Sequence, residues 1–237
     1  MKRHIKIMAV VVAMAGGIAH ATPVIDSPES WGSGIAGWTV QQPVGTSPTL
    51  SNPSGALQVT FPSQGSPLVG SAVIAANSSS SGGKFTGDYS LYGSQLAVSF
   101  QLNAIDQIPN YLGLYFYSST SGRTWQYSLT TPGSLGLSSY RILMDSALVD
   151  DFSGWHLAAP GALASDFLSD LQDVDWIGVY ISRYVSTGEG NYQLDDFTLT
   201  IPEPETILVL LAAIIPMAIT FRGQLAGLFG LLKGLVK

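Results

Sequence analysis

The sequence contains no cysteine, and this absence excludes several kinds of chemistry at once. Disulfide bonds, thiol catalysis and cysteine-ligated zinc are impossible, so the fold must be stabilised by its hydrophobic core. Histidine is nearly as scarce. Two of the three histidines, His4 and His20, lie close to the N-terminus, which leaves only His156 in the rest of the chain. A histidine-rich metal site is therefore excluded as well.

Positive charge is scarce between Thr22 and Ile201. This segment, the body of the chain, holds four cations against fourteen acids, a formal net charge of −10. The cations are Lys84, Arg123, Arg141 and Arg183. Such a body does not attract nucleic acid, because binding to phosphates depends on clustered positive charge. It is suited instead to neutral ligands and to divalent cations.

Catalytic signatures are also missing. No Gly-x-Ser-x-Gly frames a nucleophile, and no glycine-rich phosphate loop is present. The body has only two glutamates, Glu29 and Glu189, and nothing marks a pair of carboxylates placed across a cleft. We therefore assign no catalytic residue and expect a protein that is not an enzyme. A secreted glycoside hydrolase is the enzymatic alternative.

The N-terminus has the three parts of a secretory signal peptide. A basic segment contains Lys2, Arg3 and Lys6, and residues 7–15 form an apolar stretch too short to span a bilayer. Ala19 and Ala21 fit the small-x-small cleavage pattern, which makes Thr22 the first mature residue. The sequence thus predicts a signal peptide over residues 1–21, with an uncleaved anchor as the alternative.

The C-terminus, residues 202–237, reads as a second targeting segment. It opens with Pro202-Glu203-Pro204, continues with an uncharged apolar run over residues 207–221, and reaches Arg222. As a helix this run is about 22 Å long at about 1.5 Å per residue, against a bilayer core of roughly 30 Å. The run therefore predicts a marginal transmembrane helix. Leucines and glycines at helical spacing after Arg222 indicate either a continued span or a helix in the interface.

These C-terminal features resemble the PEP-CTERM sorting signal of Gram-negative bacteria. The resemblance covers about residues 202–222 and rests on Pro202, Glu203, Pro204, the apolar run and Arg222. It implies sorting by an exosortase, a membrane protease, and a link to extracellular polysaccharide or biofilm. The family usually ends soon after a cluster of basic residues, whereas here 15 residues follow a single arginine. Two outcomes stay open: cleavage of the tail, or its retention as a membrane anchor.

The body, residues 22–201, predicts a single all-β domain, a jelly-roll-like antiparallel sandwich. Aliphatic residues alternate with other residues over 96–102, 111–117 and 176–182, the period of strands with one face in the core. Shorter strands are expected over 37–42, 56–61, 69–75, 123–130, 139–144 and 154–157. Loops are expected over 78–83 and 131–139, and one short helix over 162–171 after Pro160. In the last strand the apolar series slips by one residue at Asp195-Asp196, which predicts a β-bulge.

Two segments of the body resemble secreted sandwich modules of the carbohydrate-binding, galactose-binding-like kind. They are residues 31–40, with Gly37-Trp38-Thr39-Val40, and the pair formed by residues 176–180 and 192–197. The resemblance covers about 40 residues. It implies that the first and last strands pair and close the domain.

Aromatic residues on the expected strands provide the first candidate site. If they share an exposed face, they form a platform for sugar rings, with Arg123 and Arg183 adding hydrogen bonds at its edge. The alternative is that they fill the core. The candidate residues are Tyr115, Tyr117, Trp125, Tyr127, Trp176, Tyr180 and Arg183.

Paired carboxylates provide the second candidate site. Calcium takes six to eight oxygen ligands, and Asp195 or Asp196 joined by Asp26 or Glu29 would supply some of them. No EF-hand spacing is present, and solvent-exposed turn acids are the alternative. No other cofactor is indicated.

The sequence as a whole favours an exported, exosortase-sorted protein of the cell envelope or extracellular space. It would be membrane-anchored before processing and would contact extracellular polysaccharide without catalysis. A self-associating structural protein of the matrix or cell surface is the alternative from another class.

Overall fold

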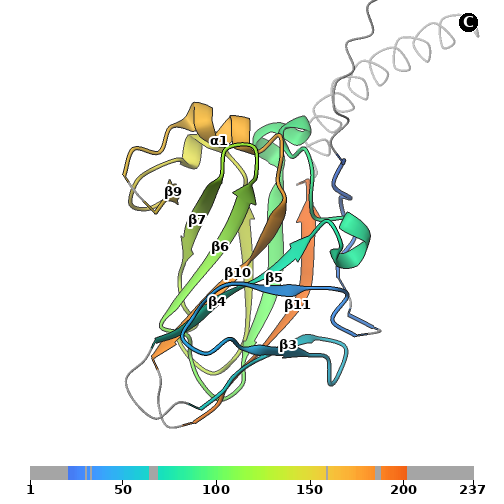
Figure 1. The fold of residues 1–237 in the computed structure, drawn as a ribbon, viewed down its shortest axis with the longest axis vertical. Coiled ribbons are helices and arrows are strands. Elements are labelled where there is room, and N and C mark those ends of the chain that lie inside the picture. Colours follow the sequence, from blue (N-terminus) through green and yellow to red (C-terminus); the bar gives the residue numbers. More distant parts are fainter. Residues whose placement is uncertain are drawn as a thin grey trace, which may run out of the picture.

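The structure is a computed structural model that describes residues 21–29, 31–32, 34–63, 69–158, 160–184 and 188–201. The predicted sorting segment 202–237 lies outside these residues, and so does the predicted signal peptide except for Ala21. The described residues form an all-β antiparallel sandwich of two sheets with few helices (Figure 1).

Eleven strands make up the two sheets in this part of the chain, and every pairing between neighbouring strands is antiparallel. The six-stranded sheet has the order β1 (Thr39–Val44), β4 (Val69–Asn77), β10 (Trp176–Tyr184), β6 (Tyr111–Ser118), β7 (Arg123–Leu129), β9 (Trp155–Leu157). The five-stranded sheet has the order β2 (Thr49–Ser51), β3 (Leu57–Phe61), β11 (Gly190–Thr200), β5 (Ala97–Ala104), β8 (Gly136–Leu143). The helix α1 (Ala164–Asp170) and the short 3-10 helices η1 (Ser80–Gly83), η2 (Ser90–Gln95) and η3 (Ser146–Leu148) lie in the connections.

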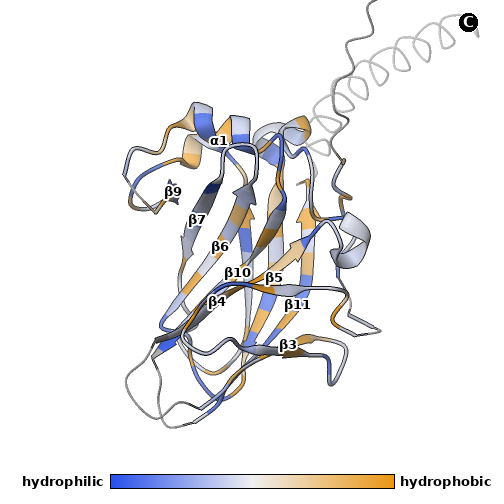
Figure 2. Cartoon of the chain, in the orientation of Figure 1, coloured by the Kyte–Doolittle hydropathy of each residue, from blue (hydrophilic) through white to orange (hydrophobic). Residues whose placement is uncertain are grey.

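The main core lies between the two sheets. Alternate residues of the strands supply it, among them Leu112, Leu114 and Phe116 of β6 and Ile177, Val179 and Ile181 of β10. Figure 2 shows hydrophobic and hydrophilic residues interleaved along the strands, as expected when one face of each sheet is buried. At one end, Trp38 meets Trp31, Phe85 and Phe197 edge to face, with ring centroids 5.0–5.9 Å apart. The core therefore needs no disulfide to hold the two sheets together.

The predicted strands and the predicted bulge are confirmed. Each of the nine strand predictions falls on a strand, and the helix expected over 162–171 is α1. The pairing of β11 with β5 shifts register between Asp195 and Thr198. Asp196 has a φ of 50°, and the apolar residues before and after it all point into the core. One extra residue thus keeps both halves of β11 on the buried face.

Three details of the sequence prediction were wrong. The strand β1 pairs with β4 rather than with the last strand, and the chain that bonds to β11 is the preceding segment, where Asp26 N donates to Leu199 O and Glu29 N to Phe197 O. The loop expected over 131–139 ends early, because β8 starts at Gly136. The strand β2 was missed, since three residues are too few to show a period.

No helix within the described residues has the length and apolar character that crossing a bilayer requires. The predicted span, residues 207–221, lies outside them.

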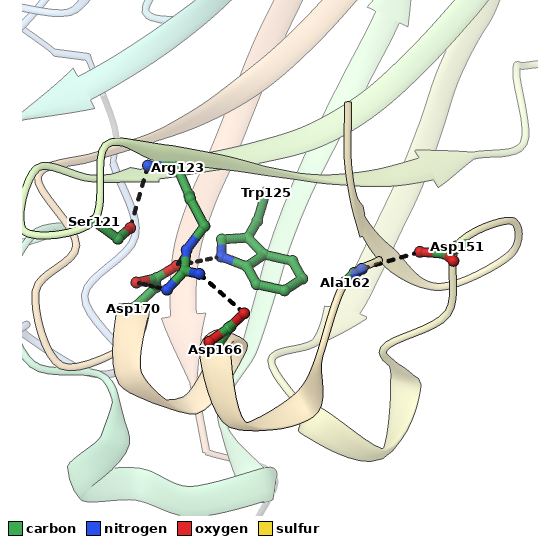
Figure 3. A network of polar contacts seen from close by, with 7 residues as sticks. All are labelled: Ser121, Arg123, Trp125, Asp151, Ala162, Asp166 and Asp170. Carbon is green, nitrogen blue, oxygen red and sulfur yellow. Dashed lines mark hydrogen bonds and ion pairs between the residues drawn. The ribbon is translucent and has the colours of Figure 1, made fainter. Parts of the chain in front are cut away.

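Buried charge and indole groups join α1 to β7. Asp170, 2% exposed, accepts hydrogen bonds from Arg123 Nε at 2.7 Å and from Trp125 Nε1 at 2.8 Å. Arg123 also forms an ion pair with Asp166 at 2.9 Å (Figure 3). The contact with Asp170 raises the pKa of the Arg123 guanidinium further. The network satisfies a carboxylate that burial alone would strongly destabilise.

Buried tyrosines predict that the protein loses stability at alkaline pH. Burial raises the pKa of Tyr89 well above 10, and it raises the pKa of Tyr192 to about 12. An unfolded tyrosine ionises near pH 10, so the folded state holds more protons above that pH, and the free energy of unfolding falls as pH rises from about 10 to about 12. We expect Tyr192→Phe to reduce this fall, measured as the difference between urea midpoints at about pH 8 and about pH 11. An unchanged difference would show that Tyr192 does not contribute.

Candidate functional site

Five aromatic side chains line the outer face of the six-stranded sheet. Tyr111, Tyr115 and Tyr117 come from β6, and Trp176 and Tyr180 come from β10. They alternate with the core residues of the same strands and form, with Val73 and Ala75 of β4, an apolar cluster separate from the main core. We call these five residues the aromatic strip. The strip runs for about 20 Å along β6, at about 3.4 Å per residue.

The rings of the strip are packed against one another. Tyr115 and Tyr180 stack with centroids 4.8 Å apart and planes within 6° of parallel. Tyr117 and Trp176 stack at 5.7 Å and 14°. Tyr111 meets Tyr180 edge to face at 5.5 Å. Cross-strand aromatic pairs of this kind stabilise a sheet and hold the rings in fixed positions.

Two glycines pair with tyrosines of the strip, and one of them makes room for a ring. A Cβ at Gly113 would lie 2.8 Å from Cε1 of Tyr115, so the Tyr115 ring folds over the position where a side chain would otherwise stand. A Cβ at Gly178 would lie 2.3 Å from the carbonyl oxygen of Ile74. Gly113 pairs with Tyr180, and Gly178 pairs with Tyr115, so each glycine faces a strip tyrosine.

The strip is partly exposed. Tyr115 is 6% exposed and Trp176 is 9% exposed, while Tyr111, Tyr117 and Tyr180 are half-buried. Burial, followed by the neighbouring Tyr111 and Tyr180, raises the pKa of Tyr115, so it stays a neutral phenol. The buried rings of Tyr115 and Trp176 therefore support the strip, and the half-buried tyrosines present ring surface to a ligand.

Polar residues flank the strip on both sides. Thr124, Gln126 and Ser128 of β7 pair with Tyr117, Tyr115 and Gly113, and Ser128 Oγ lies 2.6 Å from the Tyr111 hydroxyl. On the other side, β1 pairs with β4 through Thr39 and Gln41. Gln42 Nε2 donates to Thr124 Oγ1 at 3.3 Å, so strands from both sides approach each other at one point. The strip thus has hydroxyl and amide groups along its edges.

Two aromatic residues predicted for this face lie on the other side of the sheet. Trp125 is fully buried in the main core, where its indole donates to Asp170, and Tyr127 packs against the same core. The prediction placed them on the platform because they are aromatic. Their neighbours Thr124, Gln126 and Ser128 are polar and alternate with them, a pattern that already indicates the inward face.

Arg183 is also absent from the strip. It is 1% exposed, and its guanidinium donates to Phe61 O, Pro62 O, Gly188 O and Gln107 Oε1 at 2.6–3.2 Å. Gly190 leaves space for it, since a Cβ there would lie 2.6 Å from Arg183 Nη1. Arg183 therefore ties together the end of β3, the connection before β11 and the loop after β5, and the prediction of Arg183 as an edge donor for a ligand was wrong.

The predicted calcium ligands are not brought together. Glu29 is buried and forms an ion pair with Lys84 at 3.5 Å, Asp26 is exposed, and Asp196 accepts from Gln101 Nε2 at 2.7 Å. Within the described ranges, no group of three or more histidine, aspartate or glutamate side chains is arranged to hold a metal ion. A structural calcium ion stays a prediction that no carboxylate cluster in this part of the chain supports.

The sequence prediction missed Tyr111 as a member of the strip. Tyr111 has the same period as Tyr115 and Tyr117, so this signal was present in the sequence. It also missed a hollow on the five-stranded sheet, between β5, β8 and β11. That hollow depends on the pairing of strands far apart in the chain, which no local pattern shows.

Substitution of Gly113 tests how tightly the strip is packed. We expect Gly113→Ala to lower the free energy of unfolding by about 1–3 kcal/mol, because the methyl group overlaps the Tyr115 ring and lies 3.1 Å from Tyr127 O. Urea unfolding followed by far-UV circular dichroism measures this change. Gly133→Ala is the matched control, since nothing lies within 4 Å of its Cβ. Equal effects of the two substitutions would contradict the proposed packing.

No protein-family model matches the chain, and no curated protein matches its sequence. Similar solved structures include the agarase AgWH50C, at 14% identity and a TM-score of 0.47, over 78% of this chain and 26% of that one. They also include the family 11 carbohydrate-binding module of a Clostridium thermocellum cellulosomal cellulase, at 18% identity and a TM-score of 0.44, over 76% of this chain and 97% of that one. The L4b domain of human laminin alpha-2 is similar at 12% identity and a TM-score of 0.41, over 65% of this chain and 86% of that one.

This chain spans about a quarter of the length of the agarases that it resembles. With TM-scores below 0.5, these likenesses identify neither a ligand nor an activity for it.

Proposed function

We propose that this protein binds extracellular polysaccharide through the aromatic strip and does not transform it. The observation that carries the proposal is a row of five aromatic rings in mutual contact on an outer sheet face, with polar side chains on both sides. An aromatic cluster in the core serves packing alone. One on an outer face, partly open to solvent, provides surface for a ligand.

The strip fits a neutral sugar chain physically. The C–H faces of sugar rings pack on aromatic rings, and the hydroxyl groups around each sugar find partners such as Thr124, Gln126 and Ser128 at the edge. The body carries a net charge of −10, which repels polyanions but leaves a neutral chain unaffected. A linear ligand lying along the strip would contact several rings at once.

The acids near the strip are already engaged. Asp175 adjoins Trp176, and its carboxylate accepts from Ser119 N, while Asp173 accepts from the Thr120 hydroxyl. Both therefore hold the turn between β6 and β7. A glycoside hydrolase needs two carboxylates facing each other across the bound sugar, and the strip residues include none. This arrangement supports the proposal of binding without catalysis.

A glycan panel tests the proposal directly. The full-length chain, solubilised in a detergent without a sugar headgroup, is applied to an array of neutral and acidic polysaccharides. Binding is then measured by isothermal titration calorimetry. We expect saturable binding to at least one neutral polysaccharide, with no release of reducing ends on incubation. Absence of binding across the panel would overturn the proposal.

We also propose that the protein is exported and sorted by an exosortase-type protease. The support is the sequence of the two ends, with Ala19, Ala21 and Thr22 at one cleavage site and Pro202, Glu203, Pro204 and Arg222 in the other signal. The protein would be held at the inner membrane before processing and would then reach the cell envelope or the medium. Intact mass of the protein from both fractions tests this. A mass that includes residues 1–21 in both would contradict export with cleavage.

A second candidate function is self-association into a matrix. The strand β8 forms an edge of the five-stranded sheet and carries the exposed residues Leu137 and Leu143, at 64% and 38% exposure. An exposed edge with apolar side chains favours pairing with another chain. Sedimentation at increasing protein concentration separates the two functions, because a polysaccharide binder without self-association keeps one sedimentation coefficient.

A further inference from the structure

The five-stranded sheet carries a hollow of about 360 Å³ on its outer face. Three neighbouring strands line it, β8 with Ser139 and Arg141, β5 with Ser99 and Gln101, and β11 with Asp196 and Thr198, together with Phe100 and Tyr140. The polar members alternate with the core residues Val98, Phe100, Leu102, Ile142, Phe197 and Leu199. The hollow therefore opens away from the core, on the side of the sandwich opposite to the aromatic strip.

The register of the strands creates the hollow. Ser99 lies in the middle, paired with Arg141 on one side and with Thr198 on the other. Gln101 pairs with Ser139 and lies one step along the sheet. A small side chain at the centre with longer ones around it leaves a depression. Hydroxyl, amide, guanidinium and carboxylate groups then surround one space.

The bulge in β11 supplies the carboxylate of the hollow. Asp196 has a φ of 50°, an uncommon conformation for a residue other than glycine, and its carboxylate accepts from Gln101 Nε2 at 2.7 Å. In regular alternation, one of two adjacent aspartates would face the core. The bulge keeps both out of it and places Asp196 in the lining of the hollow.

Arg141 supplies the cation of the hollow. Lys84 pairs with Glu29, Arg123 pairs with Asp166 and Asp170, and Arg183 is buried among backbone carbonyls. Arg141 is exposed, and its side chain makes no ion pair or hydrogen bond with the described residues. Of the four cations of the body, this one alone keeps its donors available for a ligand.

From this placement we infer that the hollow is a second saccharide site, which takes one neutral sugar unit. Vicinal hydroxyls of the sugar donate to Asp196 and accept from Arg141, with Gln101 and the serine hydroxyls completing the set. One positive and one negative side chain line the hollow, so they give it no net charge. A uronate is disfavoured by the net charge of −10 that the body carries.

Two sites on opposite faces make the sandwich a cross-linker of glycan chains. This consequence depends on the proposed function, because the aromatic strip must hold one chain while the hollow holds an end or a branch of another. The main core separates the two faces, so a single chain cannot fill both sites without passing around the domain. Bivalent binding of this kind joins chains into a network.

The test uses the full-length chain in a detergent without a sugar headgroup. Methyl glycosides of glucose, galactose, mannose, N-acetylglucosamine and glucuronic acid are titrated and followed by saturation-transfer NMR and calorimetry. We expect at least one neutral glycoside to bind, and Asp196→Asn to weaken it by at least about tenfold. Asparagine tolerates the positive φ, so the backbone is kept. Glu189→Gln, at an exposed position in the connection before β11, changes the charge equally and is expected to leave binding unchanged.

The outcomes separate this inference from the proposed function. Binding of a neutral glycoside that Asp196→Asn abolishes and Trp176→Ala preserves supports the second site. The wild-type protein is expected to cross-link a soluble polysaccharide, which is measured as faster sedimentation of the polysaccharide. Loss of this cross-linking in Asp196→Asn and in Trp176→Ala supports bivalent binding. Absence of glycoside binding, equal effects of Asp196→Asn and Glu189→Gln, or tighter binding of the glucuronide overturns the second site. Glycoside binding without any polysaccharide binding overturns the proposed function and leaves the second site standing.

Discussion

Asp170→Ala is expected to lower the free energy of unfolding by about 3 kcal/mol, a large share of the total for a domain of this size. The substitution removes the acceptor for the Trp125 indole, which is fully buried, and leaves Arg123 without its closest counter-ion. A buried donor without a partner and a partly buried cation without a carboxylate both carry desolvation costs. Urea unfolding followed by tryptophan fluorescence measures the loss.

The neighbouring carboxylate provides the control for this prediction. Asp166 forms an ion pair with the same arginine, but the side chains of that pair are 31% and 35% exposed. Asp166→Ala is therefore expected to change stability by less than about 1 kcal/mol. If Asp170→Ala also cost less than this, the network shown in Figure 3 would not anchor α1 to β7 as we describe.

Removal of single rings from the aromatic strip is expected to abolish most of the polysaccharide binding. We expect Trp176→Ala and Tyr180→Ala each to weaken binding by about 2 kcal/mol, which is roughly 30-fold. Trp176 supports the ring of Tyr117, and Tyr180 stacks on Tyr115, so each substitution also loosens a second ring. Isothermal titration calorimetry with the polysaccharide selected from the panel measures the change.

An exposed aromatic residue outside the strip provides a control for non-specific binding of the polysaccharide to aromatic side chains. Phe152 is 90% exposed in the connection between η3 and β9 and is not a member of the strip. Phe152→Ala is expected to leave the affinity unchanged. Thermal melting of all variants shows whether they are folded, which matters for Trp176 because it is only 9% exposed. An equal loss in Phe152→Ala, or wild-type affinity in a folded Tyr180→Ala, would contradict the site.

The strands were predictable because their pattern is local. In β5 and β11 apolar residues alternate with polar ones, and the slip at Asp195-Asp196 appears in the sequence as a broken period. The strand β2 could not be found in this way, since it has three residues. Its identity as a strand comes from hydrogen bonds to β3, which lies beyond a turn.

The membership of the candidate site was only partly predictable. Four of the six aromatic residues proposed for the platform, Tyr115, Tyr117, Trp176 and Tyr180, lie together on the outer face, while Trp125 and Tyr127 face the core. In β6 both faces are apolar or aromatic, so its period alone does not say which face is inside. In β7 the polar residues mark the outer face, and reading them would have placed Trp125 correctly.

The amino-acid sequence by itself determined the class of the fold, the positions of most strands, the bulge, and the acidic, cysteine-free character that excludes thiol chemistry and favours neutral ligands. Only the tertiary structure decided which aromatic rings remain outside the core, that Arg183 is buried while Arg141 is exposed, and that Asp196 and Arg141 line one hollow on either side of β5. The physical reason is the separation in sequence of the residues that interact. A strand's period is set by its own residues, whereas the environment of each face is set by the strands that pair with it and by the sheet that covers it, which come from distant parts of the chain.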